Sequence, residues 1–362
     1  MIKYEDLLKV NEPFTQELGN AFNDVIASGW YIMGKQLELF EQNFAAWNNA
    51  AYCTGVANGL DALTLALKVF DLEAGSEVIV PSNTYIATIL AIMNNGLVPV
   101  LVEPDINTYN IDPVRVEQAI TPKTKALMIV HLYGKCCDMD ALMPIKTKYN
   151  LLLIEDCAQA HGASLKGKMA GTYGEFGAFS FYPTKNLGAL GDAGALLTND
   201  EQLNSSIRRV RNYGSDTKYY NDVVGVNSRL DEMQAAFLNI KLKHLHSINA
   251  KKAELAALYH QYLKDDFIKP LATAQNEVHV YHIYNIRHPK REALKAYLLK
   301  HEIGTEIHYP VPPHQQKALA DLFTGQQYPI AEEIHATTLS LPCSYAHTKD
   351  EVMRVIEVMN RF

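Results

Sequence analysis

The sequence lacks the features that mark disulfide-bonded, metal-binding, membrane-spanning and secreted proteins. Among its 362 residues are five cysteines, and the adjacent Cys136 and Cys137 fit neither a CxxC redox motif nor a zinc-binding spacing. We therefore expect reduced thiols, as in a cytoplasmic protein, and no metal site. No run of about 18 apolar residues is present, and the N-terminus lacks the apolar core of a signal peptide. Neither a membrane span nor secretion is expected.

The chain also lacks blocks of basic residues interleaved with aromatics. Its net charge is -7 at pH 7, from 33 lysines and arginines against 40 aspartates and glutamates. Nucleic acids and anionic membranes bind concentrated positive charge, so neither is an expected partner. What is present is an ordinary soluble composition, 48% hydrophobic and 20% charged, at a length that suits about two domains.

Short β-rich runs and helical segments alternate between residues 51 and 198. Strands that alternate with helices predict βαβ units and a mostly parallel sheet, here of seven strands, whose ligands bind at the carboxyl ends of the strands. The expected strands are Ala51–Val56, Glu77–Val80, Val98–Val102, Lys125–Leu132, Leu151–Ile154, Phe176–Phe181 and Ala193–Thr198. The expected helices between the first five are Gly59–Phe70, Thr84–Asn94, Pro113–Ile120 and Met139–Tyr149.

The pattern changes toward the C-terminus. Apolar residues at helical spacing predict one long helix from about Arg229 to Leu263. Short strands over Val278–Arg287 and helices over Arg291–His301 and Glu351–Arg361 follow. We expect a large domain over residues 1–245 and a smaller α+β domain over residues 246–362.

One lysine lies where a lysine is unfavourable. Lys185 occupies a turn with Pro183 and Gly188, between the two apolar strands predicted at Phe176–Phe181 and Ala193–Thr198. A cation buried there is costly unless it is neutralised, paired or used in chemistry.

Three further features occupy strand ends or the turns after them. Asp156 follows an apolar strand and could be a helix N-cap, a paired core carboxylate, or the partner of a cationic ring nitrogen. The Gly59-Leu60 turn could be a plain strand–helix turn capped by Asn58, or an anion site at a helix N-terminus. Tyr85 could be a core aromatic or a platform for a planar ligand.

Together these features match the needs of pyridoxal 5'-phosphate. Its phosphate favours a helix N-terminus, to which Ser180 can add a hydroxyl. Its pyridinium nitrogen favours a carboxylate such as Asp156, and its aldehyde forms a Schiff base with a lysine such as Lys185. The set is more specific than any member of it alone.

The same stretches resemble the DegT/DnrJ/EryC1/StrS sugar aminotransferases, which are pyridoxal-phosphate enzymes with the aspartate-aminotransferase-like α/β fold (fold type I). The resemblance spans nearly the whole chain. It is carried by Gly55-Val-Ala-Asn-Gly-Leu-Asp-Ala-Leu63, Pro81–Thr88, Glu155–Gly162, Ser180–Leu187, Gly225-Val-Asn-Ser-Arg-Leu-Asp-Glu-Met-Gln-Ala-Ala236 and Ile307-His-Tyr-Pro310.

The resemblance implies a role for each matching position. Lys185 would be the Schiff-base lysine and proton shuttle, Asp156 the pyridinium partner, and Asn227 would reach the cofactor phosphate of the neighbouring subunit in a homodimer with shared active sites. The remaining cofactor contacts would be Gly59, Leu60, Tyr85, Gln159 and Ser180. The substrate pocket would include Tyr182, Tyr213, His308 and Tyr309.

The resemblance also implies a reaction. An amino group would pass from glutamate to the C3 keto group of a dTDP-linked 3-keto-6-deoxyhexose, giving a dTDP-3-amino-3,6-dideoxy sugar for surface glycan synthesis. Arg211-Asn-Tyr-Gly-Ser215 is closer to the members that act on 3-keto sugars. A 4-keto nucleotide sugar is the alternative substrate. A sugar dehydratase and a non-catalytic regulator are the alternative functions, and the presence of Lys185 favours transamination over dehydration.

Overall fold

The seven strands expected from the sequence are all present and form one sheet. They appear in a computed structural model that describes residues 1–217 and 219–362. Their order across the sheet is β1-β9-β8-β5-β4-β2-β3. Their bounds are Tyr52–Val56 (β1), Glu77–Pro81 (β2), Val98–Val102 (β3), Thr124–Val130 (β4), Leu152–Asp156 (β5), Phe176–Ser180 (β8) and Gly194–Thr198 (β9).

The sheet is mostly parallel, as predicted, and one strand reverses its direction. Strands β3, β2, β4, β5 and β8 run parallel, whereas β9 is antiparallel to both β8 and β1. Residues 181–193 join β8 to β9 without a crossover helix, so the chain returns beside β8 in the opposite direction. That turn carries Lys185.

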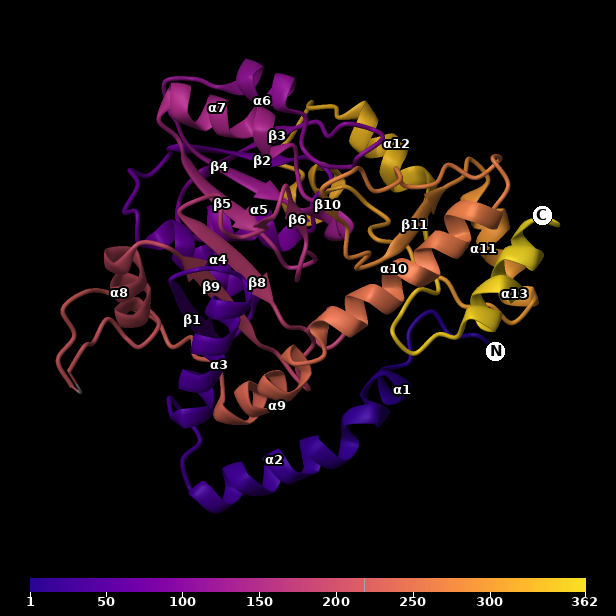
Figure 1. Ribbon diagram of the computed structural model, residues 1–362. Coiled ribbons are helices and arrows are strands. Elements are labelled where there is room, and N and C mark those ends of the chain that lie inside the picture. The colour runs from indigo at the N-terminus through magenta and orange to yellow at the C-terminus, as the bar shows by residue number, and fades with distance from the viewer. Residues whose placement is uncertain (218) are drawn as a thin grey trace.

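Helices cover both faces of the sheet (Figure 1). One face packs against α4 (Gly59–Lys68), α5 (Ile86–Met93) and α8 (Glu201–Val210). The other face packs against α3 (Lys35–Trp47) and α9 (Glu232–Leu242) at one end, and α6 (Pro113–Ala119) and α7 (Met139–Tyr149) at the other. The result is the three-layered α/β architecture that the alternating pattern predicts.

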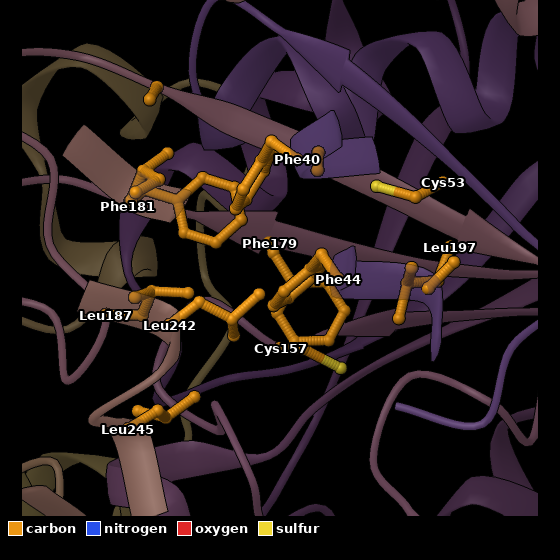
Figure 2. Close-up of a cluster of buried hydrophobic side chains, with 14 of the residues drawn as sticks. Phe40, Phe44, Cys53, Cys157, Phe179, Phe181, Leu187, Leu197, Leu242 and Leu245 are labelled. Atoms are coloured by element: carbon orange, nitrogen blue, oxygen red, sulfur yellow. The ribbon is translucent and has the colours of Figure 1, made fainter. Parts of the chain in front are cut away.

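A cluster of aromatic rings lies beneath β8 (Figure 2). Phe44 of α3 meets Phe179 and Phe181 edge to face, with ring centroids 5.0 and 5.2 Å apart. Since side chains alternate along a strand, the intervening Ser180 points to the opposite face. Packing of the two phenylalanines thus fixes the direction of Ser180 and the start of the lysine turn.

The remaining elements precede the seven-stranded sheet in the chain, form a separate small sheet, or follow the seven-stranded sheet. Before the sheet lie α1 (Leu7–Asn11), η1 (Glu12–Phe14) and α2 (Thr15–Ser28), and short strands β6 (Ser164–Leu165), β7 (Lys168–Met169) and β10 (Glu277–Val278) form a separate sheet. The C-terminal part contains α10 (Leu245–Tyr262), β11 (Tyr284–Arg287), α11 (Arg291–Lys300), η3 (Pro313–Gln315), η4 (Lys317–Leu319), α12 (Pro329–Thr337), β12 (Thr338–Leu341) and α13 (Lys349–Met359).

The single long helix predicted over Arg229–Leu263 is wrong. The chain forms two helices, α9 and α10, separated by Lys243 and His244. The N–H groups of these residues bond to carbonyls three residues back, which tightens the turn, and the His244 ring packs 5.1 Å from that of Phe14. The apolar pattern continues because Leu245 and Ile248 remain buried. The short strands predicted over Val278–Arg287 correspond to the end of β10 and to β11.

Helix α10 leads from the sheet to the C-terminal elements (Figure 1). There β11 and β12 pair antiparallel, and α10, α11 and α13 contribute to a separate apolar cluster. The N-terminal Ile2 packs against this cluster and bridges to Ile303, so the two ends of the chain lie close together. The division at residues 245 and 246 stays a prediction. In the described part of the chain, no helix has the length and apolar character needed to span a bilayer.

Candidate active site

A cavity of about 540 Å³ opens at the carboxyl end of β5. The N-termini of α4 and α5, the turn after β8 and segments of the C-terminal part complete its wall. Most residues predicted from the sequence line it: Gly59, Leu60, Tyr85, Asp156, Gln159, Ser180, Tyr182, Lys185, His308 and Tyr309. The structure therefore brings together residues that are up to 250 positions apart in the chain.

Backbone hydrogen bonds fix the turn that carries Lys185. The N–H of Lys185 donates to the carbonyl of Tyr182 at 2.8 Å, and that of Ala189 donates to Phe181 at 2.7 Å. A side chain at Gly188 would place its Cβ 2.3 Å from the Pro183 carbonyl oxygen, so only glycine fits. Burial lowers the pKa of the Lys185 ammonium to about 8, against the opposing attraction of Asp156. A substantial neutral fraction of this amine therefore exists near physiological pH.

Asp156 ends β5 with its carboxylate buried and held from two sides. Thr88 Oγ1 donates to one oxygen at 2.9 Å, and the Ala158 N–H donates to the other at 3.1 Å. Burial raises the pKa of Asp156, whereas these hydrogen bonds and Lys185 oppose the rise. The site thus holds a carboxylate that a cationic group would stabilise. Thr88 was not predicted, because nothing in the sequence links it to Asp156.

The N-terminus of α4 approaches β8 closely. Asn58 caps the helix by accepting from the N–H of Asp61 at 2.8 Å. A Cβ at Gly59 would lie 2.6 Å from Cβ of Ser180, so the absence of a side chain lets the helix start meet the Ser180 hydroxyl region. The Asn58 cap is what a plain strand–helix turn would have. The first turn of α4 also has free N–H groups, which is what an anion site would have.

An amide and two phenol rings line the opposite wall. Gln159 accepts a hydrogen bond from the N–H of Tyr133 at 2.6 Å and donates to Tyr309 Oη at 2.9 Å. Because the Tyr309 oxygen accepts from Gln159, its own proton is available to a group in the cavity. The Tyr309 ring lies 4.9 Å from that of Tyr85. Tyr85 is half-exposed in the cavity wall, so it is not a core aromatic.

Two imidazoles also face the cavity. His308 shares a hydrogen bond of 3.0 Å with Ser340 Oγ, and His282 lies 3.4 Å from the Asn186 side chain. Burial lowers the pKa of both rings, that of His308 to about 4, so both are neutral at pH 7. His282 was not predicted, because it belongs to a distant segment whose sequence gives no sign of where it packs.

Two predicted residues lie outside the cavity of their own chain. Tyr213 and Asn227 are exposed on the segment between α8 and α9, where Asn212 and Asn227 form an isolated bridge. The Arg229 guanidinium carbon lies 5.6 Å from the centre of the Tyr213 ring. The role of Asn227 toward a neighbouring subunit stays a prediction.

A second polar cluster lies behind β5. His131, Glu155 and Cys157 are buried with their potential ligand atoms within 4.8 Å of one another. The Glu155 carboxylate, however, accepts hydrogen bonds from His131 and from the N–H groups of Gly171, Tyr173 and Gly174. Its oxygens are occupied, so the cluster fastens residues 171–174 to β5.

Comparison with known proteins shows which proteins this chain resembles. The DegT/DnrJ/EryC1/StrS aminotransferase family model matches residues 14–360. A dTDP-3-amino-3,6-dideoxy-alpha-D-galactopyranose transaminase of Aneurinibacillus thermoaerophilus is 52% identical over 100% of this chain and 99% of its own.

Two crystal structures show the same fold. DesV of S. venezuelae superposes with a TM-score of 0.97 at 42% identity, covering 99% of this chain and 98% of its own. NtdA of Bacillus subtilis, with the cofactor PMP bound, superposes with a TM-score of 0.92 at 31% identity, covering 100% of this chain and 85% of its own. The chain therefore belongs to the DegT/DnrJ/EryC1/StrS aminotransferase family, whose members are pyridoxal-phosphate enzymes.

Proposed function

We propose that this protein transfers an amino group from glutamate to the C3 keto group of a dTDP-linked 3-keto-6-deoxyhexose. The product would be a dTDP-3-amino-3,6-dideoxy sugar for glycan synthesis. The observation that carries the proposal is that Lys185 and a buried Asp156 line one cavity beside a glycine-containing helix start. The 52% identical relative is named for a 3-amino-3,6-dideoxy sugar on dTDP, which supports the choice of C3.

The residues of the cavity fit pyridoxal 5'-phosphate. Gly59 leaves room for a phosphate at the first turn of α4, where free N–H groups and Ser180 are hydrogen-bond donors. Asp156 is a buried carboxylate that a nearby cation would stabilise, and the protonated pyridinium nitrogen is such a cation. Tyr85 would stack on the ring, Gln159 would contact its edge, and Lys185 would hold the aldehyde carbon. When bound, the cofactor supplies the electron sink for the reaction.

The protein's own groups would manage the protons. With a pKa of about 8, Lys185 Nζ can take a proton from the carbon that bears the amino group and return one to another carbon. The hydrogen bonds from Thr88 and Ala158 keep the Asp156 carboxylate oriented toward the cavity. His308, Tyr309 and Tyr182 would orient the sugar. A dehydratase is less favoured, because position 185 is a lysine, which can carry the proton between two carbons as transamination requires.

We infer further that the protein acts as a homodimer with shared active sites. Trp30 and Tyr31 are 64% and 53% exposed, and Val224 is 83% exposed. Ile32 bridges to Asp231, which joins the exposed apolar run 30–33 to the segment that carries Asn227. A patch of large apolar side chains around a predicted site residue is typical of a subunit interface. Two-fold symmetry would bring Asn227 of the partner subunit to each cavity.

Replacing the lysine should remove both chemistry and covalent attachment. We expect Lys185→Ala to lose at least about 100-fold in amino transfer, the contribution of a positioned acid–base group, and to bind pyridoxal phosphate only non-covalently. The measurements are product mass and intact-protein mass after borohydride reduction. Lys166→Ala, at an exposed lysine, should retain both properties. Covalently labelled Lys185→Ala would contradict the assignment.

The lowered pKa of Lys185 predicts how cofactor capture by the apoenzyme depends on pH. The neutral amine is the nucleophile, so the capture rate should rise about tenfold per pH unit below a pKa of about 8 and level off above it. Stopped-flow absorbance of pyridoxal phosphate follows the reaction. A rate that keeps rising to about pH 10, as for an ordinary lysine, would show that burial does not depress this pKa.

A substrate panel tests the position of the keto group. We expect turnover with glutamate of the dTDP-linked 3-keto-6-deoxyhexose, and little turnover of 4-keto sugars or of UDP-linked analogues. Mass spectrometry and NMR of the product report the aminated carbon. Turnover of 4-keto sugars alone would overturn the choice of C3.

The dimer is tested by charging the exposed apolar patch. Sedimentation velocity should show a dimer for the wild type. Trp30→Glu should shift the dimer toward monomer and lower activity in parallel, because each subunit would then bring a negative charge into an apolar contact. Leu299→Glu, at a 60% exposed leucine on α11, is the matched control and should remain dimeric and active. A fully active monomer would refute shared sites.

A further inference from the structure

His282 is a histidine of the cavity wall that the proposed reaction leaves without a role. It lines the wall together with Lys185 and Asp156, although it belongs to the segment between β10 and β11, and it is 8% exposed. Burial lowers the pKa of its imidazole well below the usual value, and the Lys185 cation lowers it further. At physiological pH the ring is neutral, with a proton on one nitrogen and a lone pair on the other.

The backbone around His282 is held tightly against a neighbouring turn. The N–H of Val280 donates to the Gly134 carbonyl at 3.0 Å, and a Cβ at Gly134 would lie 3.0 Å from the backbone nitrogen of His282. Tyr281, directly before His282, has a φ of 44°, a left-handed conformation that is unfavourable for a residue with a side chain. Such a conformation persists where surrounding contacts determine the backbone, and it occurs often at functional sites.

A series of side-chain amides decides which nitrogen of His282 carries the proton. The His161 carbonyl can only accept, so Asn249 donates its Nδ2 to it at 2.8 Å and leaves its Oδ1 as an acceptor for Asn186. Asn186 donates its Nδ2 to that oxygen at 2.8 Å and to the Val280 carbonyl at 2.9 Å. The Oδ1 of Asn186 is then an acceptor, and it lies 3.4 Å from Nδ1 of His282. The ring therefore carries its proton on Nδ1 and its lone pair on Nε2.

The amine of Lys185 is a donor without a partner in the same wall. Within the described part of the chain, this amine forms neither a hydrogen bond nor an ion pair. Asn186, which orients His282, is the residue after Lys185, and Lys185 is the charged group that acts most strongly on His282. A lysine side chain has many rotamers, so an amine without a partner samples positions away from a reacting carbon.

We propose that Nε2 of His282 accepts a hydrogen bond from the Lys185 amine and holds this amine beside the carbon with which it exchanges a proton. His282 is then a positioning residue, and Lys185 remains the group that moves the proton. A neutral acceptor suits this role, because a protonated imidazole would repel the lysine ammonium. The bond can form whenever the amine is not attached to the cofactor. This inference rests on the proposed function, in which Lys185 is the acid–base group.

Two amide substitutions separate the two nitrogens of His282. The side-chain amide of asparagine reaches the place of Nδ1, whereas that of the longer glutamine reaches the place of Nε2. Stopped-flow absorbance of the bound cofactor, with glutamate and no sugar, measures the first half of the reaction. His282→Asn should slow it by about 10- to 100-fold with little change in the Kd for glutamate, the loss expected when a catalytic group is displaced by about 1 Å. His282→Gln, which keeps an acceptor at Nε2, should be the faster variant.

An isotope effect distinguishes positioning from a merely structural role. With glutamate deuterated at its α-carbon, the deuterium isotope effect should be larger in His282→Asn than in the wild type, because proton transfer then limits the rate. His246→Asn, at an exposed histidine of α10, is the matched control and should behave as the wild type does. An asparagine variant at least as fast as the glutamine variant overturns the proposal. So does an unchanged glutamate reaction with a raised KM for the dTDP sugar, which would make His282 a sugar contact.

The tautomer can be measured without turnover. Nitrogen-15 NMR of the full chain labelled at histidine, with the His282 signals identified by their loss in His282→Gln, should show a protonated Nδ1 and an unprotonated Nε2. A protonated Nε2 overturns the proposal. A wild-type enzyme that takes no amino group from glutamate overturns the proposed function and the role of His282 with it. An active wild type whose His282→Asn variant is equally fast, and folded by circular dichroism, overturns only the role of His282.

Discussion

The site depends on two opposite charges in one cavity, the buried Asp156 and the half-buried Lys185. Burial alone pushes Asp156 and Lys185 toward their neutral forms, and each is drawn back by the other. Two further hydrogen bonds fix the carboxylate, and both backbone bonds and side chains such as Asn186 and Lys241 fix the turn of the lysine. A rigid acid facing an amine with a pKa near working pH is the arrangement that covalent amine chemistry needs.

The reversed strand β9 is what keeps Lys185 at the same edge of the sheet as Asp156. Strand β8 runs parallel to β5, so Ser180 and Asp156 end on the same edge of the sheet. Because β9 returns beside β8, the turn between them remains at that edge with Lys185 on it. The phenylalanines beneath β8 prevent a shift of register, since a slip of one residue would turn Ser180 into the apolar core (Figure 2).

The proposed dimer would extend the site beyond one chain. The segment that carries Tyr213, Asn227 and Arg229 is firmly anchored to α4 and α3, yet it presents these side chains outward. An anchored polar group surrounded by exposed apolar residues is suited to a symmetric contact, where each subunit supplies what the other lacks.

The sequence by itself determined the seven strands, the mostly parallel sheet and most of the residues that line the cavity. Periodicity and strand-end positions are local signals, and Lys185, Asp156 and Gly59 lie at strand ends or in the turns after them. Tertiary structure alone decided the break between α9 and α10, because the His244–Phe14 contact leaves the apolar period unchanged. It also decided that Thr88 holds Asp156 and that His282 faces the cavity. Such contacts join residues far apart in the chain, and their partners are set by packing rather than by neighbours in sequence.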